Sequence, residues 1–169
     1  FGCSTNIDND SGLPWEKHGN LQVSDNARYL VHEDGTPFLW LGCTAWGMTE
    51  WLSREDVDLY LDDRKSKGMN VVQLCLFWGK RMDYPTKFTV NPPNPYGHQA
   101  FLETDGLPDA SHPAVVEGGT PENPNDYWDH VDYCLNAIKR RGMYAAVLPF
   151  WGRRYVNASH NGQSLQVFT

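Results

Sequence analysis

Three tryptophans follow apolar segments of this chain, at positions where a side chain can meet a ligand. Trp46 comes shortly after one apolar run, and Trp78 and Trp151 each stand in a Phe-Trp-Gly triplet after another. Side chains at the carboxyl ends of parallel strands usually face a ligand. An indole face suits the flat, C–H-rich ring of a sugar, whereas Trp40 and Trp128 are expected to pack in a core. We therefore predict that the first three tryptophans contact carbohydrate.

A second group of polar side chains lies in a loop of residues 80–124 that is rich in Pro, Asn and Gly. Asn94, Tyr96 and His98 belong to the sequence Asn-Pro-Tyr-Gly-His, in which proline and glycine should stiffen the chain. Their side chains carry groups that hydrogen-bond to sugar hydroxyls. We predict that they bind carbohydrate too; the alternative is that they only shape the loop.

Cleavage of a glycosidic bond needs two carboxyl groups flanking it, about 5 Å apart for retention or roughly 6.5–9.5 Å for inversion. The predicted strand ends carry none. Catalysis requires rigid placement, so we expect the carboxylates of the long loop to be solvated. Glu50, just after Trp46, is a slightly better candidate, but we predict no catalytic residue in this chain. The loop carboxylates are Asp83, Glu103, Asp105, Asp109, Glu117 and Glu122.

Histidines suggest an alternative, a metal-dependent hydrolase. His98 and His112 lie in the long loop and His130 on a predicted helix, and strand-end His and Asp clusters often hold metals. The spacing does not favour this, because the chain has no H-x-H or H-E-x-x-H pair. His130 follows Asp129 on what reads as the polar side of its helix. We expect it at the surface and predict no metal and no cofactor.

The elements that must position these side chains recur along the chain. Residues 67–79 and 141–152 both run from a basic residue, Gly and Met through an apolar strand to Phe-Trp-Gly. Each follows a predicted amphipathic helix, one from an N-cap at Ser53 to Gly68 and one from residue 125 or 126 to Gly142. With a third apolar strand at residues 37–41, the order is βαβαβ.

Both later strands, residues 69–76 and 143–148, are almost continuously apolar, as expected in a parallel sheet covered on both faces. Upstream, residues 21–23 and 28–32 flank a turn and predict a small antiparallel β cap. A closed eight-stranded barrel typically needs about 250 residues, and this chain has 169. We expect part of a longer protein; the alternative, a self-contained small α/β domain, would leave sheet edges open.

Composition limits the partners. The net charge of -7 argues against nucleic acid, which needs a basic surface, and no apolar run is long enough to span a membrane. Four cysteines, at positions 3, 43, 75 and 134, show neither a disulfide framework nor a zinc spacing. Cys3 follows Gly2 as in the end of a bacterial lipoprotein signal. We expect residues 1–20 to form a flexible tether, with Cys3 a lipidation candidate on an exported periplasmic or cell-surface protein, or else an ordinary flexible terminus.

Five ordered motifs resemble the apiosidase-like glycoside hydrolases across residues 21–156. The motifs are Pro37-Phe38-Leu39-Trp40-Leu41-Gly42-Cys43-Thr44-Ala45-Trp46, Tyr60-Leu61 with Arg64, Gly68-Met69-Asn70-Val71-Val72-Gln73, Asn94-Pro95-Tyr96-Gly97-His98 and Leu148-Pro149-Phe150-Trp151-Gly152. The resemblance implies a (β/α)8 barrel behind a small β cap, acting on plant cell-wall glycans and often exported as a lipoprotein by gut or environmental bacteria. It also implies an acid/base Asp after the fourth strand and a Glu on a later one, both beyond Thr169. Cys43 departs from the family, which usually has Asp there, so a sugar contact of that Asp is in doubt.

Together these observations predict that residues 21–169 are the N-terminal part of a (β/α)8 TIM-barrel glycoside hydrolase, with about three strands and two helices. By itself the chain should bind oligo- or polysaccharide without cleaving it. The alternatives are a non-catalytic carbohydrate-binding half-barrel and a metal-dependent barrel hydrolase. The predicted substrate-binding residues are Trp46, Trp78, Asn94, Tyr96, His98 and Trp151.

Overall fold

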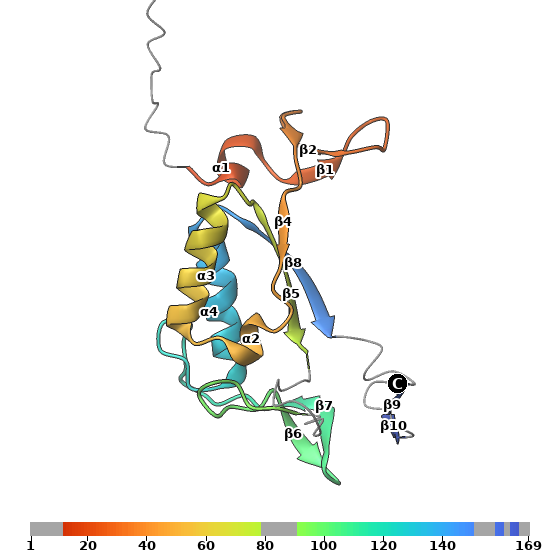
Figure 1. Cartoon of the computed structure of the whole chain (residues 1–169), viewed down its shortest axis with the longest axis vertical. Helices are drawn as coiled ribbons and strands as arrows, with labels where there is room; N and C mark the ends of the chain where they lie inside the picture. The colour runs from red at the N-terminus through yellow and green to blue at the C-terminus, as the bar shows by residue number, and fades with distance from the viewer. Residues whose placement is uncertain (1–11, 79–90, 151–157, 161–162, 166–169) are drawn as a thin grey trace, which may run out of the picture. The chain divides into compact units, whose positions relative to one another are not determined.

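The computed structural model describes residues 12–78, 91–150, 158–160 and 163–165, and the chain divides into two units, Phe1–Trp40 and Leu41–Thr169 (Figure 1). In the first unit, helix α1 (Pro14–His18) precedes an antiparallel sheet in the order β1-β2-β3. Its strands are β1 (Leu21–Val23), β2 (Leu30–His32) and β3 (Pro37–Phe38). The predicted antiparallel pairing of the first two segments is therefore present.

The first parallel strand begins later than predicted. Pro37 and Phe38 pair antiparallel with β2, and the parallel strand is β4 (Gly42–Thr44). The apolar run at residues 37–41 signals extended chain but not which sheet the chain joins. Trp40 is 52% exposed, so the prediction that it packs in a core is wrong.

The second unit is built on a parallel sheet in the order β4-β5-β8. Strand β5 (Val71–Phe77) pairs in parallel with both neighbours, and β8 (Tyr144–Phe150) is the outer strand. Helix α3 (Arg54–Ser66) connects β4 to β5, and α4 (Tyr127–Arg140) precedes β8. Figure 1 shows both helices side by side against one face of the sheet. The predicted βαβαβ order of a mixed α/β fold is confirmed.

Local signals begin and end these helices as predicted. The Ser53 hydroxyl accepts a hydrogen bond from the backbone N–H of Asp56, and the Asp126 carboxylate accepts one from Asp129 N–H. Gly68 and Gly142 follow the C-caps at φ 78° and 62°. These left-handed values favour glycine and stop the helices.

The core lies between the helices and the sheet. Val57 and Leu61 of α3 pack there with Val72 and Leu74 of β5, together with Cys134, Ala137 and Ile138 of α4. Cys43 belongs to the same cluster and is paired in register with Val72. Since side chains alternate between the faces of a strand, Cys43 lies on the helix-covered face and Thr44 on the other.

The sheet is not covered evenly. Val147 of β8 is paired in register with Leu74, so both lie on the helix-covered face, yet Val147 is 41% exposed and Leu74 is fully buried. The continuous apolar sequence of β8 predicted cover on both faces. Among the described residues the helices cover their face of the sheet over β4 and β5, whereas Gly42 and Thr44 of β4 and alternate residues of β8 are exposed.

The long loop contains a hairpin that the sequence analysis missed. Strands β6 (Phe101–Thr104) and β7 (Leu107–Pro113) pair antiparallel around Asp105 and Gly106, whose φ values are 53° and 76°. Asp-Gly is a strong signal for such a turn. A second apolar cluster joins this loop to the sheet through Phe77, Phe101 and Tyr127.

Three short elements complete the fold. The four-residue helix α2 (Met48–Trp51) follows β4, and strands β9 (Ala158–His160) and β10 (Gln163–Leu165) pair antiparallel. No helix in the described part of the chain has the length and apolar character needed to cross a membrane. The cysteines at positions 43, 75 and 134 are buried free thiols.

Candidate functional site

A pocket of about 310 Å³ opens where the parallel strands β4 and β5 end. Trp46 reaches it from the segment after β4, and Trp78 from the residue after β5. The rest of its wall comes mainly from α2 and the residues next to it, with Tyr60 from the middle of α3, so the lining is mostly apolar and aromatic. The lining residues are Thr44, Ala45, Trp46, Gly47, Met48, Trp51, Leu52, Tyr60 and Trp78.

The tryptophans of this pocket form an ordered group. The rings of Trp46 and Trp78 are nearly parallel, at 10°, with centroids 5.9 Å apart. Trp51 meets Trp78 edge to face, at 88° and 6.4 Å. A Cβ at Gly47 would collide with the Trp51 ring, so only glycine allows this close approach. Trp51 and Gly47 were not singled out from the sequence, because no local pattern links Trp51 to the end of β5.

Side chains of helix α2 form hydrogen bonds with the backbone at the end of β5, next to this aromatic group. The Glu50 carboxylate accepts a hydrogen bond from the backbone N–H of Trp78. The Thr49 hydroxyl lies 3.2 Å from the carbonyl oxygens of both Cys75 and Leu76. Residues 49 and 50 therefore fix the backbone that presents Trp78.

Tyr127 at the start of α4 adds a third anchor. Its hydroxyl donates to the Leu76 carbonyl at 2.7 Å and lies 3.3 Å from the Thr49 hydroxyl. Burial raises the pKa of Tyr127 well above its usual range, and the nearby Glu50 charge raises it further. Tyr127 therefore remains a hydrogen-bond donor at any physiological pH.

Glu50, the acidic residue considered for catalysis, is 3% exposed. Its carboxylate is hydrogen-bonded to the Trp78 backbone, and Glu50 is not among the residues that line the pocket. This geometry suits a positioning residue, because Glu50 holds the backbone of Trp78 in place.

The loop residues predicted to bind sugar lie apart from the tryptophan pocket. The buried Asn94 side chain accepts hydrogen bonds from the backbone N–H groups of Tyr96 and His98, at 3.0 and 3.1 Å. Gly97, at φ 86°, completes this turn. The Asn94 carbonyl oxygen is thus used to hold the loop.

Tyr96 docks the same turn onto α3. Its hydroxyl accepts from the backbone N–H of Arg54 at 2.9 Å, and its ring lies 4.7 Å from the Arg54 guanidinium. The structure thus brings Trp46 and Trp78 together and separates them from Asn94, Tyr96 and His98. Trp151 lies outside the described residues.

The predicted surface position of His130 is wrong. The residue is fully buried, with Nε2 3.2 Å from the Leu52 carbonyl oxygen and its ring against Tyr96. Desolvation lowers the pKa of His130 to about 4. Its spacing of four residues from Cys134, a core residue, is the sequence signal that places it on the buried stripe.

The other ionisable groups considered from the sequence are dispersed. Glu103 accepts from Gln99 at 3.0 Å, and His112 lies 2.9 Å from Asp109 on the exposed hairpin. Hydrogen bonds from Ser111 and His112 hold the pKa of the Asp109 carboxyl well below its usual range. Within residues 12–78 and 91–150, no group of three His, Cys, Asp or Glu side chains could hold a metal ion.

Comparisons with known proteins agree with this fold. The model of the family "Apiosidase-like, catalytic domain" matches residues 24–169. A crystal structure of a glycoside hydrolase family 5 protein from Bacteroides vulgatus ATCC 8482 is 36% identical, with a TM-score of 0.65 over 84% of this chain and 27% of that one. Another structure, described as a glycoside hydrolase, is 33% identical, with a TM-score of 0.62 over 83% of this chain and 27% of its own. The chain thus spans about a quarter of each structure, and a comparison with curated proteins gives no match.

Proposed function

The chain belongs to the apiosidase-like catalytic-domain family, and on that premise we propose that it forms the N-terminal part of a glycoside hydrolase barrel and supplies one side of its glycan-binding cleft. The observation that carries this proposal is the Trp46–Trp78 pair at the carboxyl ends of two parallel strands. In (β/α)8 enzymes that end of the barrel holds the active site.

The roles of the described residues follow from their contacts. The rings of Trp46 and Trp78 offer apolar faces to a sugar ring, while Glu50 and Thr49 hold the backbone that carries Trp78. Preformed placement lowers the entropy cost of binding. The hydrogen bonds of Asn94 within the loop and of the Tyr96 hydroxyl with Arg54 of α3 favour the alternative that these two residues shape the loop.

The chemical step needs a pair of carboxyl groups. The described strand ends present none, and Glu50 serves the backbone of Trp78. We assign the acid and the second carboxylate to the remainder of the full-length protein, in which this chain forms the first part of the barrel. A contact of Trp151 with sugar belongs to the same proposal.

The substrate class we propose is the side chains of plant cell-wall polysaccharides, on the family resemblance of the five motifs. Export, with lipidation at Cys3, is part of the same proposal and rests on the Gly2-Cys3 sequence alone. Residues 1–11 lie outside the described part of the chain.

The test is hydrolysis by the full-length protein, measured as sugars released from pectin and hemicellulose side chains by anion-exchange chromatography. We expect release by the wild type, unchanged by EDTA, and about a tenfold lower kcat/KM in Trp78→Ala, because one stacking face is lost. Tyr29→Ala, which removes an exposed aromatic ring of the first unit, should leave kcat/KM unchanged.

Three outcomes would contradict the proposal. Binding of glycans without any release would make the protein a carbohydrate-binding module. Loss of activity with EDTA, restored by a divalent metal, would support the metal-dependent hydrolase. Equal kcat/KM values for Trp78→Ala and wild type would mean that the aromatic pocket does not contact the substrate.

A further inference from the structure

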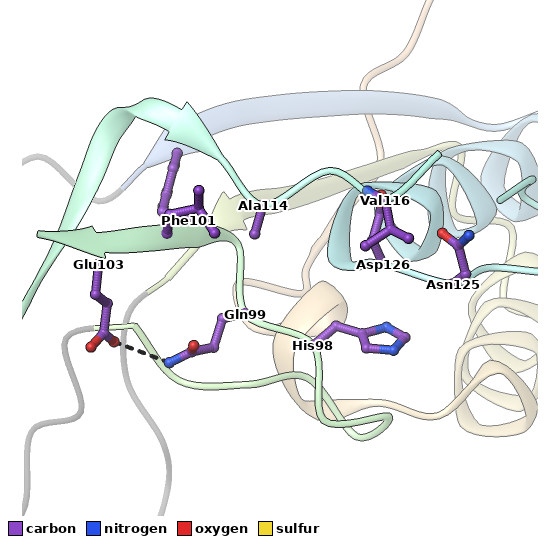
Figure 2. A pocket seen from close by; sticks show the side chains of 9 residues that line it. His98, Gln99, Phe101, Glu103, Ala114, Val116, Asn125 and Asp126 are labelled. Carbon is purple, nitrogen blue, oxygen red and sulfur yellow. Dashed lines mark hydrogen bonds between the residues drawn. The ribbon is translucent and has the colours of Figure 1, made fainter. Parts of the chain in front are cut away.

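A second pocket, of about 280 Å³, lies between the long loop and the start of α4. Figure 2 shows Gln99, Phe101 and Glu103 toward one side of it and His98, Asn125 and Asp126 toward the other, with Ala114 between. None of the Trp46 pocket's lining residues belongs to it. The two pockets are separate.

The acidic groups of this pocket are held in fixed positions. Asp126, 3% exposed, accepts hydrogen bonds from the backbone N–H groups of Val116 and Asp129, at 2.7 and 2.8 Å. Glu103 accepts from the Gln99 amide at 3.0 Å. Each carboxylate oxygen can accept further bonds, so the pocket offers rigid acceptors.

His98 adds a group that the protein leaves unused. Two hydrogen bonds with Asn94 fix its backbone. The Asn94 N–H donates to the His98 carbonyl oxygen at 2.8 Å, and the His98 N–H donates to the Asn94 side-chain oxygen at 3.1 Å. Its ring atom Nδ1 is buried and forms no hydrogen bond with any described residue. The imidazole is one of the residues that line the pocket, and its other ring nitrogen, Nε2, can exchange a hydrogen bond with a ligand hydroxyl there.

The remaining wall is apolar and open to solvent. Leu102 and Val116 line the pocket at 57% and 53% exposure, and Phe101 forms its buried part. A ligand that fits must pair C–H surface with several hydroxyl groups, which is the chemistry of a sugar ring. The carboxylates of Glu103 and Asp126 repel an acidic sugar, and His98 is the single basic side chain among the lining residues.

We propose that this pocket is a second saccharide subsite, which binds an uncharged sugar residue through His98, Glu103 and the apolar wall of Phe101 and Leu102. The inference rests on the proposed glycan-binding function and adds a subsite that selects against uronic acids. A branched or extended glycan would occupy both pockets.

The test uses the full-length protein and isothermal titration with neutral xylo-, arabino-, galacto- and gluco-hexaoses and with hexagalacturonate. We expect at least one neutral hexaose to bind and His98→Leu to raise its Kd about three- to tenfold, the worth of one hydrogen bond. The matched control His112→Leu, on the exposed hairpin, should leave Kd unchanged. Thermal melting checks that each variant is folded.

A second variant tests the charge selection without removing the pocket's shape. Glu103→Gln keeps an oxygen that can accept from Gln99, and it should improve binding of hexagalacturonate relative to the neutral hexaose several-fold at low salt. Wild-type Kd values in both His98→Leu and Glu103→Gln would overturn the subsite. Failure of the wild type to bind or hydrolyse any glycan would instead overturn the proposed function, and the subsite with it.

Discussion

Glu50 should act on the structure of the site and not on the reacting bond. Its carboxylate accepts from the backbone N–H of Trp78 and is almost fully buried. Two replacements separate the roles: Glu50→Gln keeps an acceptor oxygen of the same reach, and Glu50→Ala removes the acceptor. Glu117→Ala, at an exposed position of the long loop, is the matched control.

The expected magnitudes follow from the hydrogen bond. A bond to a charged group contributes about 1.5–3 kcal/mol and a neutral one about 0.5–1.5 kcal/mol, so Glu50→Gln should lower the free energy of unfolding by about 1 kcal/mol. Glu50→Ala leaves the Trp78 N–H without this acceptor and leaves a cavity where the buried side chain was. We expect a loss of roughly 2–4 kcal/mol.

The assay combines urea unfolding, followed by tryptophan fluorescence, with kcat and substrate Kd of the full-length protein. A positioning role predicts that Glu50→Gln lowers kcat less than tenfold, whereas Glu50→Ala weakens both folding and substrate binding. General acid or base catalysis contributes about 10²–10⁴-fold. A kcat loss above a hundredfold in a Glu50→Gln variant with wild-type stability would refute our reasoning, as would unchanged stability of Glu50→Ala.

Two further substitutions test buried groups through the pH dependence of stability, measured by urea unfolding. The pKa of His130 is lowered from 6.5 to about 4 in the folded state, so the free energy of unfolding should fall as pH drops between these values. We expect a loss of about 2 kcal/mol between pH 7 and pH 5. A pH profile of stability as steep in His130→Leu as in the wild type would contradict this. Cys43→Asp buries a carboxyl in the helix-side core and should cost roughly 2 kcal/mol or more at pH 7, with the loss shrinking toward pH 4 because burial raises the pKa of the new group. Unchanged stability of Cys43→Asp together with tighter substrate binding would contradict this reasoning and would support a sugar contact at position 43.

The site was only partly predictable. Trp46 and Trp78 could be found because each follows a parallel strand, and such strands end at one edge of a sheet. The roles of Glu50 and Thr49 depend on contacts with residues 25 or more positions away, which no local pattern records. His130 was misplaced because the adjacent Asp129 was given more weight than the helical spacing to Cys134.

The sequence by itself determined the local elements of this protein. Caps at Ser53 and Asp126, glycine stops at 68 and 142, and apolar runs specify α3, α4, β5 and β8, because these signals act within a few residues. Only the tertiary structure decided which side of β4 carries Cys43. A strand's two faces differ only once the helices pack on one of them, and that choice joins residues from β4, β5 and both helices.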